Sequence, residues 1–350
     1  MGSSNRRGRI VAIIGSLLIV GVVTALTYVW FADSLDGVKY PMTQWAPLGD
    51  NAAAIHDVYI LIFILAGIVF VGIMALTLIF SLVYRERPGQ VARQFHGNSR
   101  LEVLWTLIPV LIVVVMAVPT FSTIAETHAP APEGALEVRA IGHQWWFEFE
   151  YPELGITTAN ELHIPVDRAV NVTLESEDVI HSFWVPRLAG KVDMVPGRVN
   201  RLWFTPFEAS DEPYLGQCAE FCGMAHANMR FRVFVETQDD FDAWVTAASA
   251  DRPEPESDVM VAGEQQFLQS GCVGCHTVRG NSVAQGDVGP DLSNIGSRTT
   301  IAAGMLDNTP ENMRRWLSDP PEVKPGSLMP DLELSDEAID RLVAYLEGLE

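Results

Sequence analysis

The chain has 350 residues, 48% of them hydrophobic, and its formal net charge is −21 at pH 7. This length predicts two or three domains. Residues 122–350 hold 38 acidic and 15 basic side chains, whereas the first 121 residues hold 6 and 8. Because so acidic a part would repel phosphate groups, we expect no nucleic-acid partner, and a basic protein partner is favoured.

Three long stretches without charged residues come first along the chain, at residues 10–31, 58–84 and 103–125. Each is long enough to cross a lipid bilayer as a helix, which takes about 20 apolar residues. The second and third predict a two-helix transmembrane hairpin over residues 55–126. The first follows basic residues, so residues 1–32 are predicted to be either a signal peptide or an extra transmembrane helix.

Arginines set the predicted topology. They precede the first stretch and separate the second from the third (Arg6, Arg7, Arg9, Arg85, Arg87, Arg93 and Arg100). Short loops rich in positive charge stay on the cytoplasmic side of a membrane. The part of the chain after residue 125 is therefore expected outside the cytoplasm.

Beyond residue 134 the hydrophobic pattern changes to alternation, in the segments 135–140, 161–166, 169–176, 200–206 and 229–237. Short alternating segments separated by Gly, Pro, Asn and Asp predict a β-sandwich or barrel. We expect this domain at residues 134–248, with a short helix at 239–248. Residues 249–258 are rich in acids and proline and predict an exposed acidic linker.

The last part of the chain, residues 259–350, has helical character. Apolar residues at Ile339, Leu342, Val343 and Leu346 follow the spacing of one helix face. Ser335 is the predicted N-cap of this helix.

Two of the four cysteines lie in the sequence CVGCH, as Cys272 and Cys275 followed by His276. This spacing is the attachment signature of a c-type haem, in which the thiols form thioethers and the histidine binds iron. The alternatives are a redox disulfide or half of a zinc site, but residues 277–350 contain no further Cys or His. Cytochromes c mature outside the cytoplasmic membrane, which agrees with the predicted topology.

A low-spin haem iron also needs a sixth ligand, for which Met305, Met313 and Met329 are the downstream candidates. Met329 lies in a segment rich in Pro and Gly just before the last helix, and a loop there can approach a flat cofactor closely. Met305 and Met313 lie nearer helical patterns. We therefore predict Met329 as the ligand.

The other two cysteines belong to the stretch CAEFCGMAHANM, which contains Cys218, Cys222, His226 and Met229. Soft sulfur donors together with imidazole favour copper over magnesium or calcium. Two thiolates can bridge two copper ions, each of which then takes one histidine and one weak ligand. The second histidine would be His181.

Two other interpretations of this stretch remain open. A tetrahedral zinc ion could bind both cysteines, His226 and His181, but it would leave Met229 unused. A disulfide between Cys218 and Cys222 is reasonable for an exported domain, but it would leave both histidines and the methionine unused.

The stretch at residues 218–229 resembles the copper A loop of subunit II of haem–copper cytochrome c oxidases. The segments LEVLWTLIP, GHQWWFEFEYP and EDVIHSFWVPRLAGKVDMVPGR also resemble that family and occur in the same order. Residues 260–350 resemble the cytochrome c domain fused to subunit II in some bacterial oxidases. The resemblance implies a membrane-anchored multidomain protein with a transmembrane helical hairpin, an all-β cupredoxin-like sandwich and an all-α cytochrome c domain.

This resemblance also implies roles for individual residues. The dicopper ligands of the family match His181, Cys218, Glu220, Cys222, His226 and Met229. Glu220 would contribute its main-chain oxygen to copper and its carboxylate to a magnesium or manganese ion shared with subunit I. Trp145 matches the aromatic residue where electrons enter from cytochrome c. Glu102 matches an acid at the mouth of a proton channel into subunit I.

We therefore predict subunit II of a cytochrome c oxidase in a bacterial plasma (inner) membrane, with its soluble domains on the periplasmic or extracellular face. Electrons would pass through haem c and copper A to subunit I, where oxygen is reduced to water with proton translocation. The expected partners are subunit I, other oxidase subunits, lipid, and a donor such as cytochrome c or a quinol–cytochrome c reductase complex. The alternatives are the same module in a nitric oxide reductase and an exported structural or copper-storage protein.

Overall fold

The computed structural model describes residues 3–33, 39–84, 89, 91, 96–250, 255 and 257–350. Arg85, Arg87 and Arg93, which entered the topology prediction, lie outside the described residues, and so do residues 251–254 and 256 of the predicted linker. Contacts divide the chain into two units. One comprises Met1–Ala46 and Ala54–Ala129, and the other comprises Pro47–Ala53 and Pro130–Glu350.

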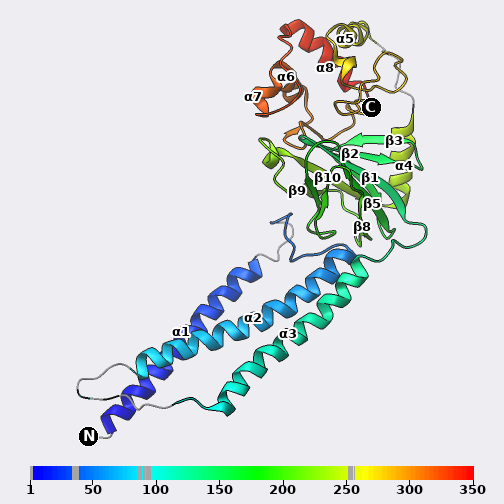
Figure 1. The fold of residues 1–350 in the computed structure, drawn as a ribbon. Helices are drawn as coiled ribbons and strands as arrows, with labels where there is room; N and C mark the ends of the chain where they lie inside the picture. The colour runs from blue at the N-terminus through cyan, green and yellow to red at the C-terminus, as the bar shows by residue number, and fades with distance from the viewer. Residues whose placement is uncertain are drawn as a thin grey trace. The chain divides into compact units, whose positions relative to one another are not determined.

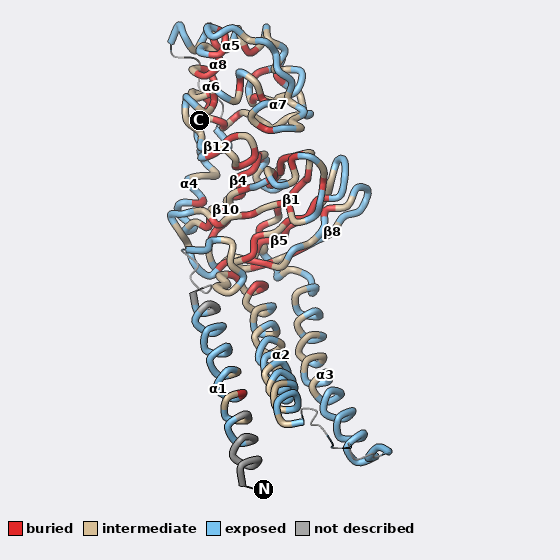
Figure 2. Tube along the Cα trace, turned by 90° about the vertical axis from the view of Figure 1, so that its left-hand side faces the viewer, coloured by how far each residue is buried: buried red, intermediate tan, exposed pale blue. Residues whose placement is uncertain are grey.

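Three long helices come first, α1 (Ser3–Asp33), α2 (Asp50–Val83) and α3 (Ser99–Thr127) (Figure 1). Within the described residues, α2 and α3 are the helices long and apolar enough to cross a membrane. All residues of α3 are described, and each of them is at least partly exposed although most are apolar (Figure 2). Apolar side chains along the whole helix surface are what a lipid-facing helix requires, so the predicted hairpin is confirmed.

Helix α1 contains the first apolar stretch. Its strongly apolar section, Ile13–Val29, is shorter than α2 or α3. The choice between a signal peptide and an extra transmembrane helix therefore stays a prediction.

The sandwich domain, residues 136–249, consists of two five-stranded sheets followed by helix α4 (Gln238–Ser249). The strands are β1 (Leu136–His143), β2 (Trp146–Tyr151), β3 (Ile156–Ala159), β4 (Glu161–Pro165), β5 (Val170–Ser176), β6 (His181–Trp184), β7 (Val192–Met194), β8 (Asn200–Phe204), β9 (Tyr214–Cys218) and β10 (Arg230–Glu236). One sheet has the order β3-β2-β1-β5-β8 and the other β4-β10-β9-β6-β7. The pairs β1–β5 and β4–β10 are parallel, and the other strand pairs are antiparallel.

Alternation along the strands explains the core between the two sheets. In β5, Val170, Val172 and Leu174 are fully buried while the residues between them are half-exposed. From the opposite sheet, Phe183 of β6 stacks on Phe231 of β10 with ring centroids 4.9 Å apart. The buried strand positions form one cluster through the sandwich domain (Figure 2).

The C-terminal domain, residues 257–350, is mainly helical. It contains α5 (Asp258–Gln269), the short 3-10 helix η2 (Cys272–Gly274), α6 (Pro310–Ser318), α7 (Pro320–Val323) and α8 (Asp336–Glu347). It also contains a two-stranded ladder of β11 (Thr300–Ile301) and β12 (Leu306–Asp307), which sequence reasoning did not predict. Two residues pair in each strand, too few to give an alternating pattern.

The packing of α5 on α8 forms the core of this domain. Ser335 caps α8 by accepting a hydrogen bond from the Ala338 amide, as predicted. The predicted apolar face of α8 is buried. Gly263 of α5 permits the close approach, because a β-carbon there would lie 2.2 Å from the main-chain oxygen of Arg341.

Candidate metal and haem centres

Strand pairing brings together two distant parts of the copper-binding motif. Cys218 ends β9 and pairs with Phe183 of the neighbouring antiparallel strand β6. His181 opens β6, so it lies near Cys218 although 37 residues separate the two in sequence. The pairing of β6 with β9 therefore supplies the histidine that the loop after β9 lacks.

The two sulfur atoms of the loop face each other. The Sγ atoms of Cys218 and Cys222 lie 3.8 Å apart, whereas a disulfide has a length of about 2.05 Å. All four cysteines of the chain are in the described residues, and all four are free. The Nδ1 atom of His181 lies 3.9 Å from Cys218 Sγ, and the main-chain oxygen of Glu220 lies 3.2 Å from the same sulfur.

Two further donors lie beside the second sulfur. His226 opens the 3-10 helix η1 (His226–Asn228), and its Nδ1 lies 3.6 Å from Cys222 Sγ. Met229 is fully buried directly before β10, with its Sδ 3.9 Å from Cys222 Sγ. Two thiols, two imidazoles, a thioether and a carbonyl thus converge, and this soft donor set fits copper. A disulfide is incompatible with the sulfur–sulfur distance, and zinc would leave the thioether unused.

Hydrogen bonding between the thiols makes one of them acidic. The contact with Cys222 lowers the pKa of Cys218 to about 3, and His181 contributes in the same direction. The same contact raises the pKa of Cys222, because a second negative charge beside the first is unfavourable. The pair therefore retains one proton until a cation displaces it, which is how metal binding deprotonates thiols.

Asp178 orients His181, and sequence reasoning did not identify it. His181 is fully buried, and its Nε2 lies 2.7 Å from Asp178 Oδ1. A carboxylate partner fixes the proton on Nε2 and leaves Nδ1 free to bind a metal. Burial lowers the pKa of His181, but its hydrogen bonds with Cys218 and Asp178 outweigh burial and raise the pKa overall. The spacing of three residues between Asp178 and His181 was the only local signal.

Trp145 lies directly against the copper-binding loop. It is 8% exposed, and its Nε1–H donates to the main-chain oxygen of Cys222 at 3.0 Å. The side chain of Gln144 donates to the same oxygen at 2.7 Å. On the other side, a β-carbon placed on Gly326 would lie 3.2 Å from the indole ring. The indole therefore fills the space between the loop and the C-terminal domain.

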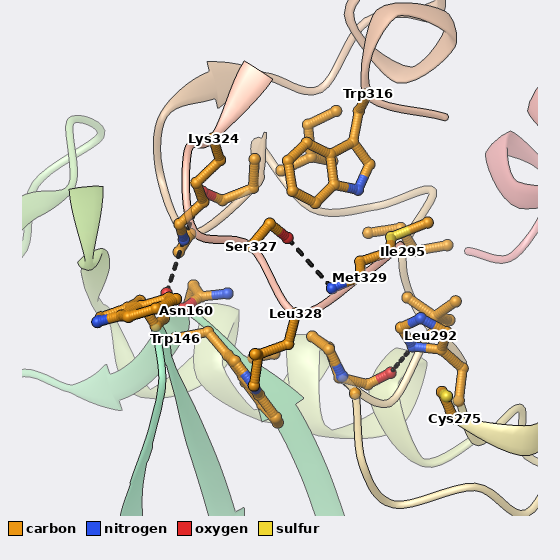
Figure 3. A pocket seen from close by; sticks show the side chains of 18 of the residues that line it. Trp146, Asn160, Cys275, Leu292, Ile295, Trp316, Lys324, Ser327, Leu328 and Met329 are labelled. Carbon is orange, nitrogen blue, oxygen red and sulfur yellow. Dashed lines mark hydrogen bonds between the residues drawn. The ribbon is translucent and has the colours of Figure 1, made fainter. Parts of the chain in front are cut away.

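A cavity in the C-terminal domain contains three of the four predicted haem-binding residues, whereas Cys272 is not among its lining residues and packs against the core of the domain (Figure 3). Cys275, His276 and Met329 line it, together with Trp316 and, from the sandwich domain, Trp146. The side chain of Cys275 is exposed. A group held here would be covered largely by apolar side chains.

His276 is prepared for binding iron through one nitrogen. Its Nδ1 donates to the main-chain oxygen of Pro290 at 2.8 Å, which leaves Nε2 free. Burial lowers the pKa of His276, which favours the neutral ring that a metal ligand needs. A β-carbon on Gly289 would lie 2.6 Å from the ring, so only glycine fits beside it.

The candidate methionines differ in position. Met329 lies in the loop between α7 and α8 and lines the cavity, as its sequence context predicts. Met313 also lines the cavity but belongs to α6, where it is buried in the core of the domain. Met305 lies just before β12 and is not among the residues that line the cavity.

The two acids assigned from family resemblance belong to different parts of the chain. Glu102 is in the first turn of α3, where its Oε1 accepts a hydrogen bond from the Asn98 amide at 3.1 Å. Asn98 in turn caps α3 by accepting from the amides of Arg100 and Leu101. The side chain of Glu220 is exposed on the copper-binding loop.

Three family models match the chain in succession. Residues 44–123 match the transmembrane domain of cytochrome c oxidase subunit II, residues 154–236 match its periplasmic domain, and residues 260–350 match cytochrome c. The two membrane helices and the periplasmic position of the sandwich domain follow from these matches.

Curated relatives agree over most of their length. The chain is 38% identical to cytochrome c oxidase subunit 2 of Alkalihalophilus pseudofirmus, over 88% of this chain and 91% of that protein. It is 37% identical to the subunit of Bacillus sp. strain PS3, over 76% and 80% of the two chains, and 35% identical to that of Bacillus subtilis, over 76% and 79%. The chain belongs to the cytochrome c oxidase subunit II family and combines a copper A domain with a fused cytochrome c domain.

Proposed function

We propose that electrons enter this subunit through the C-terminal domain, cross to the copper A site by way of Trp145, and leave for the catalytic subunit of the oxidase. The observation that carries the proposal is a path that runs along the methionine loop and then through contacts of Trp145 to the copper-binding loop. Met329 is three residues from Gly326, which packs on the Trp145 ring. That ring donates a hydrogen bond to the main chain of Cys222.

At the copper site, the proposed ligands divide into two sets that share both thiolates. His181 and Met229 complete one set, and His226 and the main-chain oxygen of Glu220 complete the other. When bound, a dicopper centre supplies an electron acceptor whose charge is shared between two metals. The surrounding residues hold the donors in place, because Cys218, Cys222 and Met229 are buried and need little rearrangement.

At the haem site, Cys272 and Cys275 would form the thioethers, and His276 and Met329 would bind the iron. A c-type haem supplies a one-electron carrier, and a methionine ligand raises its potential. Pro290 orients His276, and the hydrogen bond from the Met329 amide to Ser327 Oγ, at 3.3 Å, stabilises the methionine loop (Figure 3).

Several finer assignments belong to the same proposal. The exposed Glu220 carboxylate is suited to a magnesium or manganese ion at the contact with subunit I. Glu102 would stand at the proton-channel entrance. We assign the domain limits as 55–126, 134–248 and 259–350, the membrane as the bacterial plasma membrane, and the donor as cytochrome c or a quinol–cytochrome c reductase complex. An acidic surface attracts a basic donor.

The variant Cys218→Ser tests this order of transfer in the purified oxidase complex. It should abolish the near-infrared absorption of the dicopper centre and leave the c-type haem spectrum intact. The haem should still be reduced by the donor but no longer be reoxidised by oxygen. Reoxidation at the wild-type rate would refute the route through copper. Consumption of nitric oxide instead of oxygen by the wild-type complex would favour the reductase alternative.

A further inference from the structure

A buried lysine joins the C-terminal domain to the sandwich domain. Lys324 follows α7 and is 4% exposed. Its Nζ donates to the main-chain oxygen of Trp145 at 2.7 Å and to that of Ala302 at 3.4 Å. The lysine thus bonds to the residue proposed to receive electrons, and it lies on the loop that carries Met329.

A buried glutamate of the sandwich domain makes a second connection between the two domains. Glu161, at the start of β4, is 3% exposed. Its Oε1 accepts from the amide and hydroxyl of Thr299, at 2.8 and 2.6 Å, and from the amide and hydroxyl of Thr300, at 3.1 and 3.4 Å. Both threonines belong to the C-terminal domain.

Main-chain and apolar contacts complete the interface. The Arg230 amide donates to the main-chain oxygen of Ala303 at 3.2 Å. Trp146 and Ala159 of the sandwich domain form a buried cluster with Ala303. If the C-terminal domain moved freely on its linker, the interface groups would be exposed to water each time it separated from the sandwich domain.

Lys324 also lines the cavity of the C-terminal domain. Neither Lys324 nor Glu161 is among the proposed copper or haem ligands. Lys324 is buried, so its ammonium group has lost much of its hydration, and this burial lowers its pKa to about 7. Removing water from a charged group is unfavourable unless hydrogen bonds replace it. The carbonyl oxygen of Ala302 belongs to the same domain as Lys324, whereas the carbonyl oxygen of Trp145 is within reach only while the two domains are in contact.

We propose that Lys324 and Glu161 are positioning residues that hold the C-terminal domain in one fixed orientation on the sandwich domain. This inference rests on the proposed function, because the fixed orientation keeps the methionine loop against Trp145. Electron transfer within the subunit then needs no domain movement. The linker joins two docked domains and does not have to let the haem domain diffuse to and from the copper site.

Hydrogen exchange at the interface tests the proposal in the intact oxidase complex. The amides of Thr299, Thr300 and Arg230 donate across the interface, so they exchange when the domains separate. In Lys324→Met these amides should exchange at least about tenfold faster, which corresponds to about 1.4 kcal/mol of docking free energy. The Leu136 amide, bonded within the sandwich domain to Ala169, should be unchanged.

Matched variants control for charge and for local disorder. Arg315→Met removes an exposed cation from the same domain and should leave all these amides as in the wild type. Glu161→Ala removes the second connection and should accelerate exchange at Arg230, whereas Glu153→Ala, at an exposed carboxylate, should not. Unchanged exchange at Thr299 and Arg230 in Lys324→Met would overturn the proposal, because the lysine would then stabilise only its own loop.

A kinetic measurement separates this proposal from the proposed function. In the wild type, flash-induced transfer from haem to copper should be independent of solvent viscosity, and in Lys324→Met it should slow and become viscosity-dependent. Haem and copper spectra should be retained in both. Viscosity-dependent transfer in the wild type would refute the fixed orientation and leave the route intact. Absence of any transfer in the wild type would refute the route itself.

Discussion

Replacing Asp178 with asparagine tests how His181 is held at the copper site. The carboxylate accepts three hydrogen bonds. Oδ1 accepts from His181 Nε2 at 2.7 Å and from the Val179 amide at 2.6 Å, and Oδ2 accepts from the Gln144 amide at 2.6 Å. Asparagine has the same shape but only one acceptor oxygen. In one orientation of the asparagine, His181 loses its hydrogen-bond acceptor. In the other, the new NH₂ group faces the main-chain N–H of Gln144, so that two donors oppose each other.

The expected loss of copper affinity follows from the role of Asp178 as the hydrogen-bond partner of a metal-binding histidine. Loss of the group that orients a metal-binding histidine lowers metal affinity about 10–100-fold, which corresponds to about 1.4–2.7 kcal/mol. The assay is a titration of the oxidase complex with a copper chelator, followed by the near-infrared absorption of copper A. In Asp178→Asn, copper should be released at a chelator concentration about 10–100-fold lower.

The neighbouring Glu177 provides the control because its side chain is exposed. Glu177→Gln removes the same charge without touching His181 and should release copper as the wild type does. Equal release from Asp178→Asn and the wild type would refute the reasoning. An equally large effect in Glu177→Gln would also refute it, because surface charge would then explain the change.

Three further predictions concern the other parts of the chain. Met329→Ala should lower the haem reduction potential in a redox titration, whereas Met313→Leu should not, since a methionine ligand raises the potential. Ile339→Ala removes a 2% exposed side chain of α8 and should destabilise the C-terminal domain by about 2–5 kcal/mol in denaturant unfolding. Glu175→Gln breaks the pair with Arg139, whose hydrogen bond lowers the pKa of Glu175 below the usual 4.5. Because Glu175 binds its proton less readily in the folded state, the pair stabilises the fold, by about 1 kcal/mol or less at this partly exposed site. This stabilisation should be present above pH 4.5 and vanish as the pH falls through the lower folded-state pKa of Glu175. An equal difference in thermal stability between Glu175→Gln and the wild type at pH 3 and pH 7 would contradict this.

The sequence was informative wherever a repeating pattern was long enough. Segments 169–176 and 229–237 alternate over seven or more residues and correspond to β5 and β10. Strands β6 and β7 have only four and three residues, so no period can be read from them. β6 takes its place in the sheet by pairing with β9, and β7 takes its place by pairing with β6; the β6–β9 pairing is a tertiary contact.

In the candidate sites too, local sequence patterns could be recognised and tertiary contacts could not. Donors close in sequence, such as Cys218, Cys222 and His226, could be recognised from their spacing. Asp178 and Lys324 could not, because an isolated acid or lysine in sequence gives no sign of burial or of a partner. Lys324 reaches the carbonyl of a residue 179 positions away, and only the docked structure shows that contact.

The hydrogen bond between Glu102 and the Asn98 amide has a consequence for experiments on proton uptake. One carboxylate stabilises the start of a helix and is also the proposed proton entrance, so an alanine there would disturb both at once. A glutamine keeps an oxygen for the amide but cannot ionise. Comparing the two replacements therefore separates loss of helix capping from loss of a titratable group.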